Sequence, residues 1–267
     1  MPSAIRLSLL LTTVLAAGAV AQTPNPNPVP KDPSQWPQHS RTRPAPPVVT
    51  PGPYLGPQAP PSDAIVLFAG SSLDNWRSAD TTKGMKAAPW KVENGDIVVA
   101  PGTGDIATKR GFGNMQLHIE WSAPNPPHGE DQDRGNSGVF LMSTYEIQVL
   151  DSYHAATYPD GQAAAIYGEV PPMVNAMRPP GEWQVYDIVF HRPHFDAAGR
   201  VTQPARVTVI HNGVLVQDNM TILGPTTNGH RSAYLKHADR MPLQLQDHNH
   251  PVRYRNIWVR ELPDDGS

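Results

Sequence analysis

Cysteine is missing from this 267-residue sequence, and charged residues make up only 17% of it. The lack of cysteine excludes a disulfide scaffold, a thiolate nucleophile and any metal site with cysteine ligands. The formal net charge of −3 leaves no basic excess. Binding to nucleic acid or to an anionic membrane needs such an excess to neutralise phosphates, so the sequence predicts neither partner.

A helical pattern is also lacking, because no window repeats apolar residues every three to four positions over the length of a helix. The sequence has instead short runs of β-branched and aromatic residues between turn signals. Two of these turns, Asn94-Gly95 and Asn212-Gly213, tolerate the positive φ of a tight hairpin. About ten such runs within about 200 residues predict an all-β sandwich. Two of the expected strands lie within 90–99, on either side of Asn94-Gly95. The others are 65–68, 115–121, 138–143, 145–150, 184–192, 205–210, 214–218, 243–248 and 257–262.

The amino-terminal segment has the pattern of an export signal. Arg6 precedes an apolar stretch, residues 7–20, that ends in Ala19-Val20-Ala21. A positive residue, a short apolar stretch and a small-x-small site are typical of a cleaved secretory signal peptide, which we place at residues 1–21. An uncleaved anchor is the alternative, although a membrane span needs about 20 apolar residues. We expect a secreted or periplasmic protein with no membrane attachment after cleavage.

Proline is concentrated after this signal, since residues 22–62 hold 14 of the 31 prolines. Proline has no backbone N–H for helices or sheet ladders, so this stretch predicts an extended, partly polyproline and disordered linker. Within it, Trp36 and Tyr54 either dock on the folded domain or remain solvated in a tether. The folded domain itself is expected over residues 63–263.

Two predicted strands separate apolar from polar side chains. Successive side chains of a strand point to opposite faces, so Glu146 and Gln148 share one face while their apolar neighbours point to the core. Gln246 and His248 share a face in the same way. If both polar faces belong to one sheet, they form a floor that suits sugar hydroxyls, which donate and accept hydrogen bonds. The alternative is a face that is polar only because water covers it.

Several short motifs, each weak alone, occur together over residues 64–262. Their identities and their order, given at the end of this paragraph, resemble the DUF1080 family, the 3-keto-disaccharide hydrolase domain. The sequence departs from the family pattern at the proline-rich segment, at an acidic insertion over 124–134, and at Ala69, where the family usually has asparagine. The motifs are Phe68-Ala69-Gly70, Trp90-Lys91-Val92-Glu93-Asn94-Gly95, Gly135-Asn136-Ser137-Gly138-Val139, Tyr145-Glu146-Ile147-Gln148-Val149-Leu150-Asp151, Ala165-Ile166-Tyr167-Gly168, Gly181-Glu182-Trp183-Gln184, His211-Asn212-Gly213, Leu245-Gln246-Asp247-His248 and Arg255-Asn256-Ile257-Trp258.

The resemblance implies a concanavalin A-like jelly-roll sandwich of two antiparallel sheets. It implies hydrolysis of glycosides whose sugar carries a ketone at C3, by an enzyme that bacteria export and that acts together with a separate oxidoreductase. A C3 ketone acidifies the proton on C2, so a base can remove it and the C1 substituent can leave by elimination. Water then adds at C1. This route needs a general base, stabilisation of the enolate oxygen and an acid for the leaving group.

Three residues are the catalytic candidates. Glu146 is expected to be the base or a metal ligand, because it lies on the polar strand face. His248 is the acid–base candidate among 11 histidines, because histidine is the residue type that changes charge near neutral pH. Asp151 orients a partner or binds metal, or else only caps a turn. Asp247 is expected to make a structural hydrogen bond.

The substrate contacts are expected from five further residues. Amides hold sugar hydroxyls, other side chains line the rim, and an arginine binds an oxyanion. No cofactor is required by this scheme, although a divalent metal could stabilise the enediolate as a Lewis acid; the sequence has no recognisable metal-ligand signature. The hydroxyl-holding residues are Gln148 and Gln246, the rim residues are Asn136 and Tyr167, and the arginine is Arg134.

Two other functions compete with this interpretation. A non-catalytic, lectin-like carbohydrate-binding module is the main alternative, because fold does not fix function. An ordinary endo-glucanase would need a strand of the Glu-x-Asp-x-x-Glu type, and Gln148 stands where its second acid would be.

Overall fold

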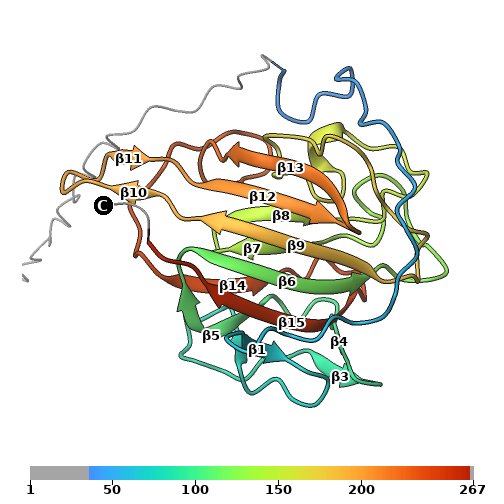
Figure 1. Ribbon diagram of the computed structural model, residues 1–267, viewed down its shortest axis with the longest axis horizontal. Coiled ribbons are helices and arrows are strands. Elements are labelled where there is room, and N and C mark those ends of the chain that lie inside the picture. The colour runs from blue at the N-terminus through green and yellow to red at the C-terminus, as the bar shows by residue number, and fades with distance from the viewer. Residues whose placement is uncertain (1–35, 265–267) are drawn as a thin grey trace, which may run out of the picture.

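The computed structural model describes residues 36–264 (Figure 1). The predicted signal peptide, residues 1–21, and the predicted linker up to residue 35 lie outside the described residues. The described chain is built from strands, with one short 3-10 helix, η1 (Pro159–Gly161), and no α-helix. Residues 36–264 hold no helix with the length and apolar character that crossing a bilayer requires.

Two antiparallel sheets form the two layers of the molecule. A small third sheet pairs β10 (His194–Phe195) with β11 (Val201–Gln203). The larger sheet has eight strands in the order β13 (Val214–Thr221), β12 (Arg206–His211), β9 (Gln184–His191), β6 (Met115–Ser122), β15 (Arg253–Glu261), β4 (Asp96–Val98) and β3 (Lys91–Glu93), with β1 (Ile65–Phe68) also paired to β15. The smaller sheet has five strands in the order β2 (Trp76–Ser78), β5 (Ile106–Phe112), β14 (Met241–Leu245), β7 (Ser137–Leu141) and β8 (Tyr145–Val149).

The expected fold class is confirmed, because the described chain is all-β with antiparallel sheets, an architecture consistent with a jelly roll. Both predicted hairpins are present: Asn94 and Gly95 join β3 to β4, and Asn212 and Gly213 join β12 to β13. Asn94 has a φ of 53° and Gly95 one of 84°. Asparagine and glycine reach this region at low cost, which is why the dipeptide marked the turn.

Two predicted boundaries differ from the structure. The predicted strand 243–248 ends at Leu245, so Gln246 and His248 lie just beyond β14 rather than on it. The pattern also missed β5, which pairs with both β2 and β14. Its sequence IATKRGF carries exposed Lys109 and Arg110 in the middle, which break the alternation that marks a half-buried strand.

The core lies between the two sheets. Tyr145, Ile147 and Val149 point into it from β8, as the alternation predicted, and all three are fully buried. From the opposite sheet, Trp121 and Tyr186 meet edge to face with ring centroids 5.5 Å apart. Burial of such side chains stabilises the sandwich by about 25 cal/mol per Å² of apolar surface, and it fixes which face of β8 is left for other uses.

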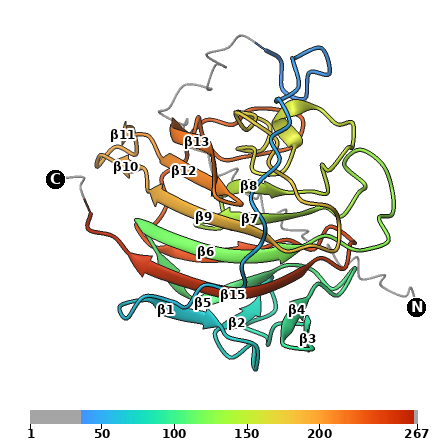
Figure 2. The same cartoon turned by 45° about the vertical axis from the view of Figure 1, so that its right-hand side comes forward.

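Residues 36–62, here called the strap, have no regular strand, as their proline content predicts. They nevertheless lie against the sandwich, so the expectation of a disordered linker is wrong for this part of the segment. Val48 forms an isolated bridge with Asn175, and the Arg178 side chain donates to the Gly52 carbonyl at 2.9 Å. Figure 2 shows the strap, in blue, crossing in front of β9, β6 and β15.

Tyr54 anchors the strap to the outer face of the larger sheet. Its hydroxyl donates to Glu120 Oε2 at 2.7 Å and accepts from Arg255 at 2.7 Å. Burial alone would raise the pKa of Glu120, but hydrogen bonds from His118 and others outweigh it and lower that pKa to about 2. Of the two alternatives for Tyr54, docking on the domain is the one observed.

Candidate active site

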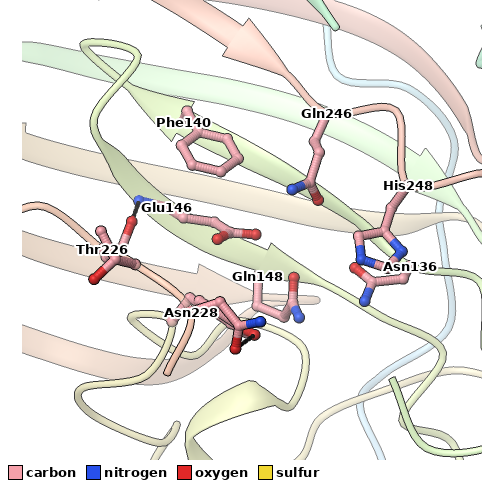
Figure 3. A pocket seen from close by; sticks show the side chains of 10 residues that line it. Asn136, Phe140, Glu146, Gln148, Thr226, Asn228, Gln246 and His248 are labelled. Atoms are coloured by element: carbon pink, nitrogen blue, oxygen red, sulfur yellow. Dashed lines mark hydrogen bonds between the residues drawn. The ribbon is translucent and has the colours of Figure 1, made fainter. Parts of the chain in front are cut away.

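A cavity of about 180 Å³ opens on the outer face of the smaller sheet (Figure 3). Its lining brings together six of the eight residues that the sequence singled out. These six come from β8, from the turn before β7, from the chain after β14 and from the loop that follows η1. The six are Asn136, Glu146, Gln148, Tyr167, Gln246 and His248, and the other lining residues are Phe140, Thr226, Thr227 and Asn228.

Glu146 and Gln148 occupy the polar face of β8, and other parts of the chain cover most of that face. Glu146 is 5% exposed and Gln148 is 1% exposed. The loop after η1 pairs with the free edge of β8, since Tyr167 N–H donates to the Glu146 carbonyl at 3.2 Å. On the same strand, Glu146 N–H donates to the Thr226 hydroxyl at 2.9 Å. A plain solvated sheet face is therefore excluded.

The carboxyl group of Glu146 is placed by a glycine on the neighbouring strand. A Cβ atom at Gly138 would lie 2.4 Å from Glu146 Oε1, so the absence of a side chain there leaves room for the carboxyl group. Burial, and secondarily the charge of Asp105, raise the pKa of Glu146 to about 8. A carboxyl group with such a pKa can exchange a proton near neutral pH.

Gln246 and His248 are held by a carboxylate clamp behind the pocket. Asp105 Oδ1 accepts the backbone N–H of Asp247 at 2.8 Å, and Asp247 Oδ2 accepts the N–H of Gly104 at 2.9 Å. Asp247 thus makes the structural hydrogen bond expected of it. Asp105 escaped the sequence analysis because it belongs to no motif and comes beside Asp247 only through the pairing of β5 with β14.

Two amide oxygens in the lining have no hydrogen-bond partner within residues 36–264. Asn136 donates through Nδ2 to the Gln132 carbonyl at 2.8 Å, while its Oδ1 is buried and unpaired. Gln246 Oε1 is buried and unpaired as well. An unpaired buried acceptor costs free energy unless a ligand satisfies it, so both oxygens suit the hydroxyl donors of a bound molecule.

Arg134 and Asp151 are not part of this lining. Their side chains pair with each other, with Arg134 Nε donating to Asp151 Oδ2 at 2.8 Å. Asp151 Oδ1 also accepts the N–H of Tyr153 at 3.2 Å, the pattern of an Asx turn. Burial raises the pKa of Asp151, and the Arg134 charge opposes that rise. This placement matches the turn-capping alternative for Asp151 and pairs the Arg134 guanidinium with it through Nε.

The residues that the sequence analysis missed lie on one turn-rich loop and one strand. Thr226, Thr227 and Asn228 come from a Gly-Pro-Thr-Thr-Asn-Gly stretch that reads only as a turn. Phe140 is an apolar residue on the outer face of β7, paired with Glu146 across the ladder. No sequence pattern joins Thr226–Asn228 to Glu146, because they lie about 80 residues apart along the chain, and Phe140 gives no signal of a site because an apolar residue in a strand is expected in the core.

The described residues do not form a preassembled set of metal ligands at this pocket. Among residues 36–264, no group of three or more histidine, aspartate or glutamate side chains is arranged to hold an ion. The pocket lining offers one carboxylate and one imidazole, together with neutral amides and hydroxyls. Since this donor set does not amount to a metal site by itself, the chemistry below uses side chains only.

The chain is similar to proteins of known structure that are candidate glycosyl hydrolases. The chain is 48% identical to a solved candidate glycosyl hydrolase from Parabacteroides distasonis ATCC 8503, over 82% of this chain and 93% of that one, with a TM-score of 0.73. Two more candidate glycosyl hydrolases from that organism, each 19% identical with a TM-score of 0.51, share the fold over 75% and 74% of this chain and 94% and 99% of theirs. No curated protein matches the chain.

These matches place the chain among glycosyl-hydrolase-like β-sandwich proteins. It belongs to the 3-keto-alpha-glucoside-1,2-lyase-like domain family, DUF1080, whose pattern matches residues 63–260. The resemblance seen in the motifs is thereby confirmed, and the matched range agrees with the predicted start of the domain.

Proposed function

We propose that this protein is an exported glycoside hydrolase that cleaves 3-keto-glycosides, including 3-keto-disaccharides. Family membership supports a hydrolase-type enzyme. The observation that carries the proposal is Glu146, the single carboxylate in the pocket lining, with a pKa raised to about 8. An ordinary glycosidase needs two opposed carboxyl groups, whereas removal of a C2 proton needs one base.

The proposed reaction proceeds in two stages. Ionised Glu146 takes the C2 proton of the bound keto-sugar, and the enediolate that forms expels the C1 substituent, whose oxygen receives a proton from His248. Water then adds to the C1=C2 bond: its hydroxyl goes to C1, its other proton goes to His248, and Glu146 returns its proton to C2, so both side chains regain their starting forms. The net change is hydrolysis of the glycosidic bond with the ketone retained.

The pocket has room for one sugar ring. Its volume of about 180 Å³ is smaller than the ~300–1,000 Å³ of sites that hold drug-sized ligands. Gln148, Gln246 and Asn136 would bind the hydroxyls of the keto-sugar, and Tyr167 would border the opening through which the leaving group projects. This geometry favours recognition of the oxidised sugar over recognition of its partner in the glycoside.

The cellular setting follows from the sequence and forms part of the proposal. The predicted signal peptide directs the protein to the periplasm or the medium of a bacterium. Because the substrate carries a ketone at C3, a separate oxidoreductase must produce it from the unmodified carbohydrate.

The first experiment is an assay of the mature chain, residues 22–267, on 3-keto-trehalose and on a 3-keto aryl glucoside, beside the unoxidised sugars. We expect release of the leaving group from the keto substrates alone, at a rate that a chelator does not change. Cleavage of the unoxidised sugars would contradict the proposed chemistry. Binding without cleavage would favour the lectin-like module, and inhibition by chelator would show that a metal takes part.

A further inference from the structure

The start of the strap, residues 36–43, reaches the wall of the pocket. This part of the chain precedes the domain that the family pattern matches, residues 63–260. It makes none of the pocket lining itself. It contacts the outer side of two lining residues, Tyr167 and Thr227, through the contacts described below, and Asn228 is hydrogen-bonded to the Tyr167 hydroxyl at 3.5 Å.

Gln38 contacts both halves of this wall. Its Nε2 donates to the Thr227 carbonyl at 2.6 Å. The same amide packs directly on the backbone of Gly168, where an added Cβ would lie 2.1 Å from Gln38 Nε2. Gln38 therefore joins the loop after η1 to the Thr226–Asn228 loop, two segments that no strand pairs with each other in the described chain.

His39 supports the tyrosine side of the wall. Its ring stacks on Tyr158 with centroids 4.1 Å apart and lies 5.2 Å from the ring of Tyr167. The hydroxyls of Tyr158 and Tyr167 are hydrogen-bonded at 2.9 Å. The backbone N–H of His39 also donates to Asp160 Oδ2 at 2.9 Å, and the Asp160 carbonyl accepts from Gly168 at 2.8 Å.

We propose that residues 36–43 are a structural part of the pocket, and that Gln38 and His39 are positioning residues for the wall formed by Tyr167, Thr227 and Asn228. Neither residue touches the reacting atoms. The position of the Glu146 carboxyl group is set by β8 and by the space at Gly138, which the strap does not contact, so a small displacement of the wall should weaken substrate binding more than the chemical step. The effect on turnover rests on the proposed function, whereas the effect on the wall does not.

The test uses Gln38→Ala and His39→Asn in the mature chain, with Thr42→Ala as the matched control. Asparagine tolerates the left-handed backbone of His39, which has a φ of 57°, so the second variant removes the ring without straining the chain. Thr42 lies in the same segment and is exposed. Within residues 36–264, its hydroxyl is hydrogen-bonded only to the Ser40 hydroxyl, with 3.0 Å between the two oxygens. Two quantities are measured: the kinetic constants on 3-keto-trehalose and hydrogen exchange of the wall.

We expect KM to rise about fivefold to tenfold in each variant while kcat changes less than about twofold, since each substitution removes about one hydrogen bond or stacking contact. Backbone exchange at Tyr167, Gly168 and Asn228 should become faster in both variants and stay unchanged in the control. Unchanged exchange in both would overturn the inference. If the unaltered protein cleaves no keto-sugar, the proposed function fails, and the exchange data alone decide whether the wall depends on the strap.

Discussion

Burial of one carboxyl group sets the chemistry of the pocket and also has a cost for the fold. Because the pKa of Glu146 is raised to about 8 by burial and by Asp105, the folded protein holds a proton there that the unfolded chain releases at a lower pH. Stability contributed by this group is therefore lost as pH rises from about 4.5 towards 8. A destabilising group kept at this position is expected at a site where proton transfer matters.

Glu146→Gln should abolish most turnover while it stabilises the fold at high pH. Loss of a general base typically costs about 10²–10⁴-fold in kcat. The melting temperature of the variant should equal that of the unaltered protein near pH 4.5 and exceed it increasingly up to about pH 8, where the difference levels off, because glutamine cannot ionise. In the unaltered protein, kcat/KM should rise with pH through about 8, because the base must be ionised.

The control for this variant is Glu93→Gln, since Glu93 is an exposed carboxylate on β3. It should change neither turnover nor the pH dependence of melting. A kcat/KM that falls with rising pH through 8 would assign Glu146 the role of acid. Carbohydrate binding retained with no turnover in either protein would point instead to a binding module.

The pairing of β7 with β8 determines where the Glu146 carboxyl group lies. Phe140 pairs with Glu146 and Gly138 with Gln148. The Gly138 position faces the pocket, so its missing side chain is what lets the Glu146 carboxyl group lie across the strand. The clamp of Asp105 and Asp247 performs a comparable task for the chain after β14.

Gly138→Ala should leave the fold intact and impair catalysis. The new Cβ would lie 2.4 Å from Glu146 Oε1 and 2.8 Å from Phe140 Cε2, and both are ends of side chains that can move. Displacement of a catalytic group by about 1 Å can cost about 10²-fold in rate. We expect that loss in kcat/KM, measured beside the melting temperature.

The matched control is Gly52→Ala, because no atom lies within 4 Å of a Cβ built there. It should behave as the unaltered protein in both measurements. Full activity in Gly138→Ala would mean that the carboxyl group does not need its observed position.

At the scale of the whole molecule, the strap joins both faces of the sandwich. It crosses β9, β6 and β15 on the outer face of the larger sheet (Figure 2). Its first residues reach the pocket wall on the side of the smaller sheet, where His39 meets Tyr158. We therefore expect the hydrogen bonds of Tyr54 to hold the strap against the sandwich, so that the strap is part of the folded domain and not a tether.

Tyr54→Phe should destabilise the folded protein by about 2 kcal/mol, since it removes hydrogen bonds to the charged Glu120 and Arg255. For a protein of this size, that loss lowers the melting temperature by about 4–8 °C. Turnover at 25 °C should change little, because Tyr54 lies on the face opposite the pocket.

Tyr153→Phe provides the comparison, because the Tyr153 hydroxyl makes no hydrogen bond within residues 36–264. It should melt within about 1 °C of the unaltered protein, because the substitution removes only a hydroxyl without a hydrogen-bond partner in the described chain and keeps the half-buried ring. Equal melting of the two variants would show that the strap adds no stability through Tyr54.

The sequence by itself determined the local features. Asn-Gly dipeptides located two hairpins, because few residues accept positive φ at both turn positions. Alternation along 145–149 separated the core residues from Glu146 and Gln148, because a strand has a strict period of two. The motifs, in their order along the chain, identified the family. Six of the eight candidate site residues selected from the sequence line one pocket.

Only the tertiary structure decided what covers those faces. Thr226–Asn228 and the loop after η1 bury Glu146, and that burial raises its pKa; neither follows from the residues around position 146. Arg134 and Asp151 pair with each other outside the lining because they lie at the two ends of the β7–β8 hairpin, which the strand pairing brings side by side. The proline content of the strap predicted a tether, because proline disfavours strands. Docking on the sandwich needs only side-chain and carbonyl contacts. Such contacts depend on partners more than 60 residues away along the chain, as in the Tyr54–Glu120 pair.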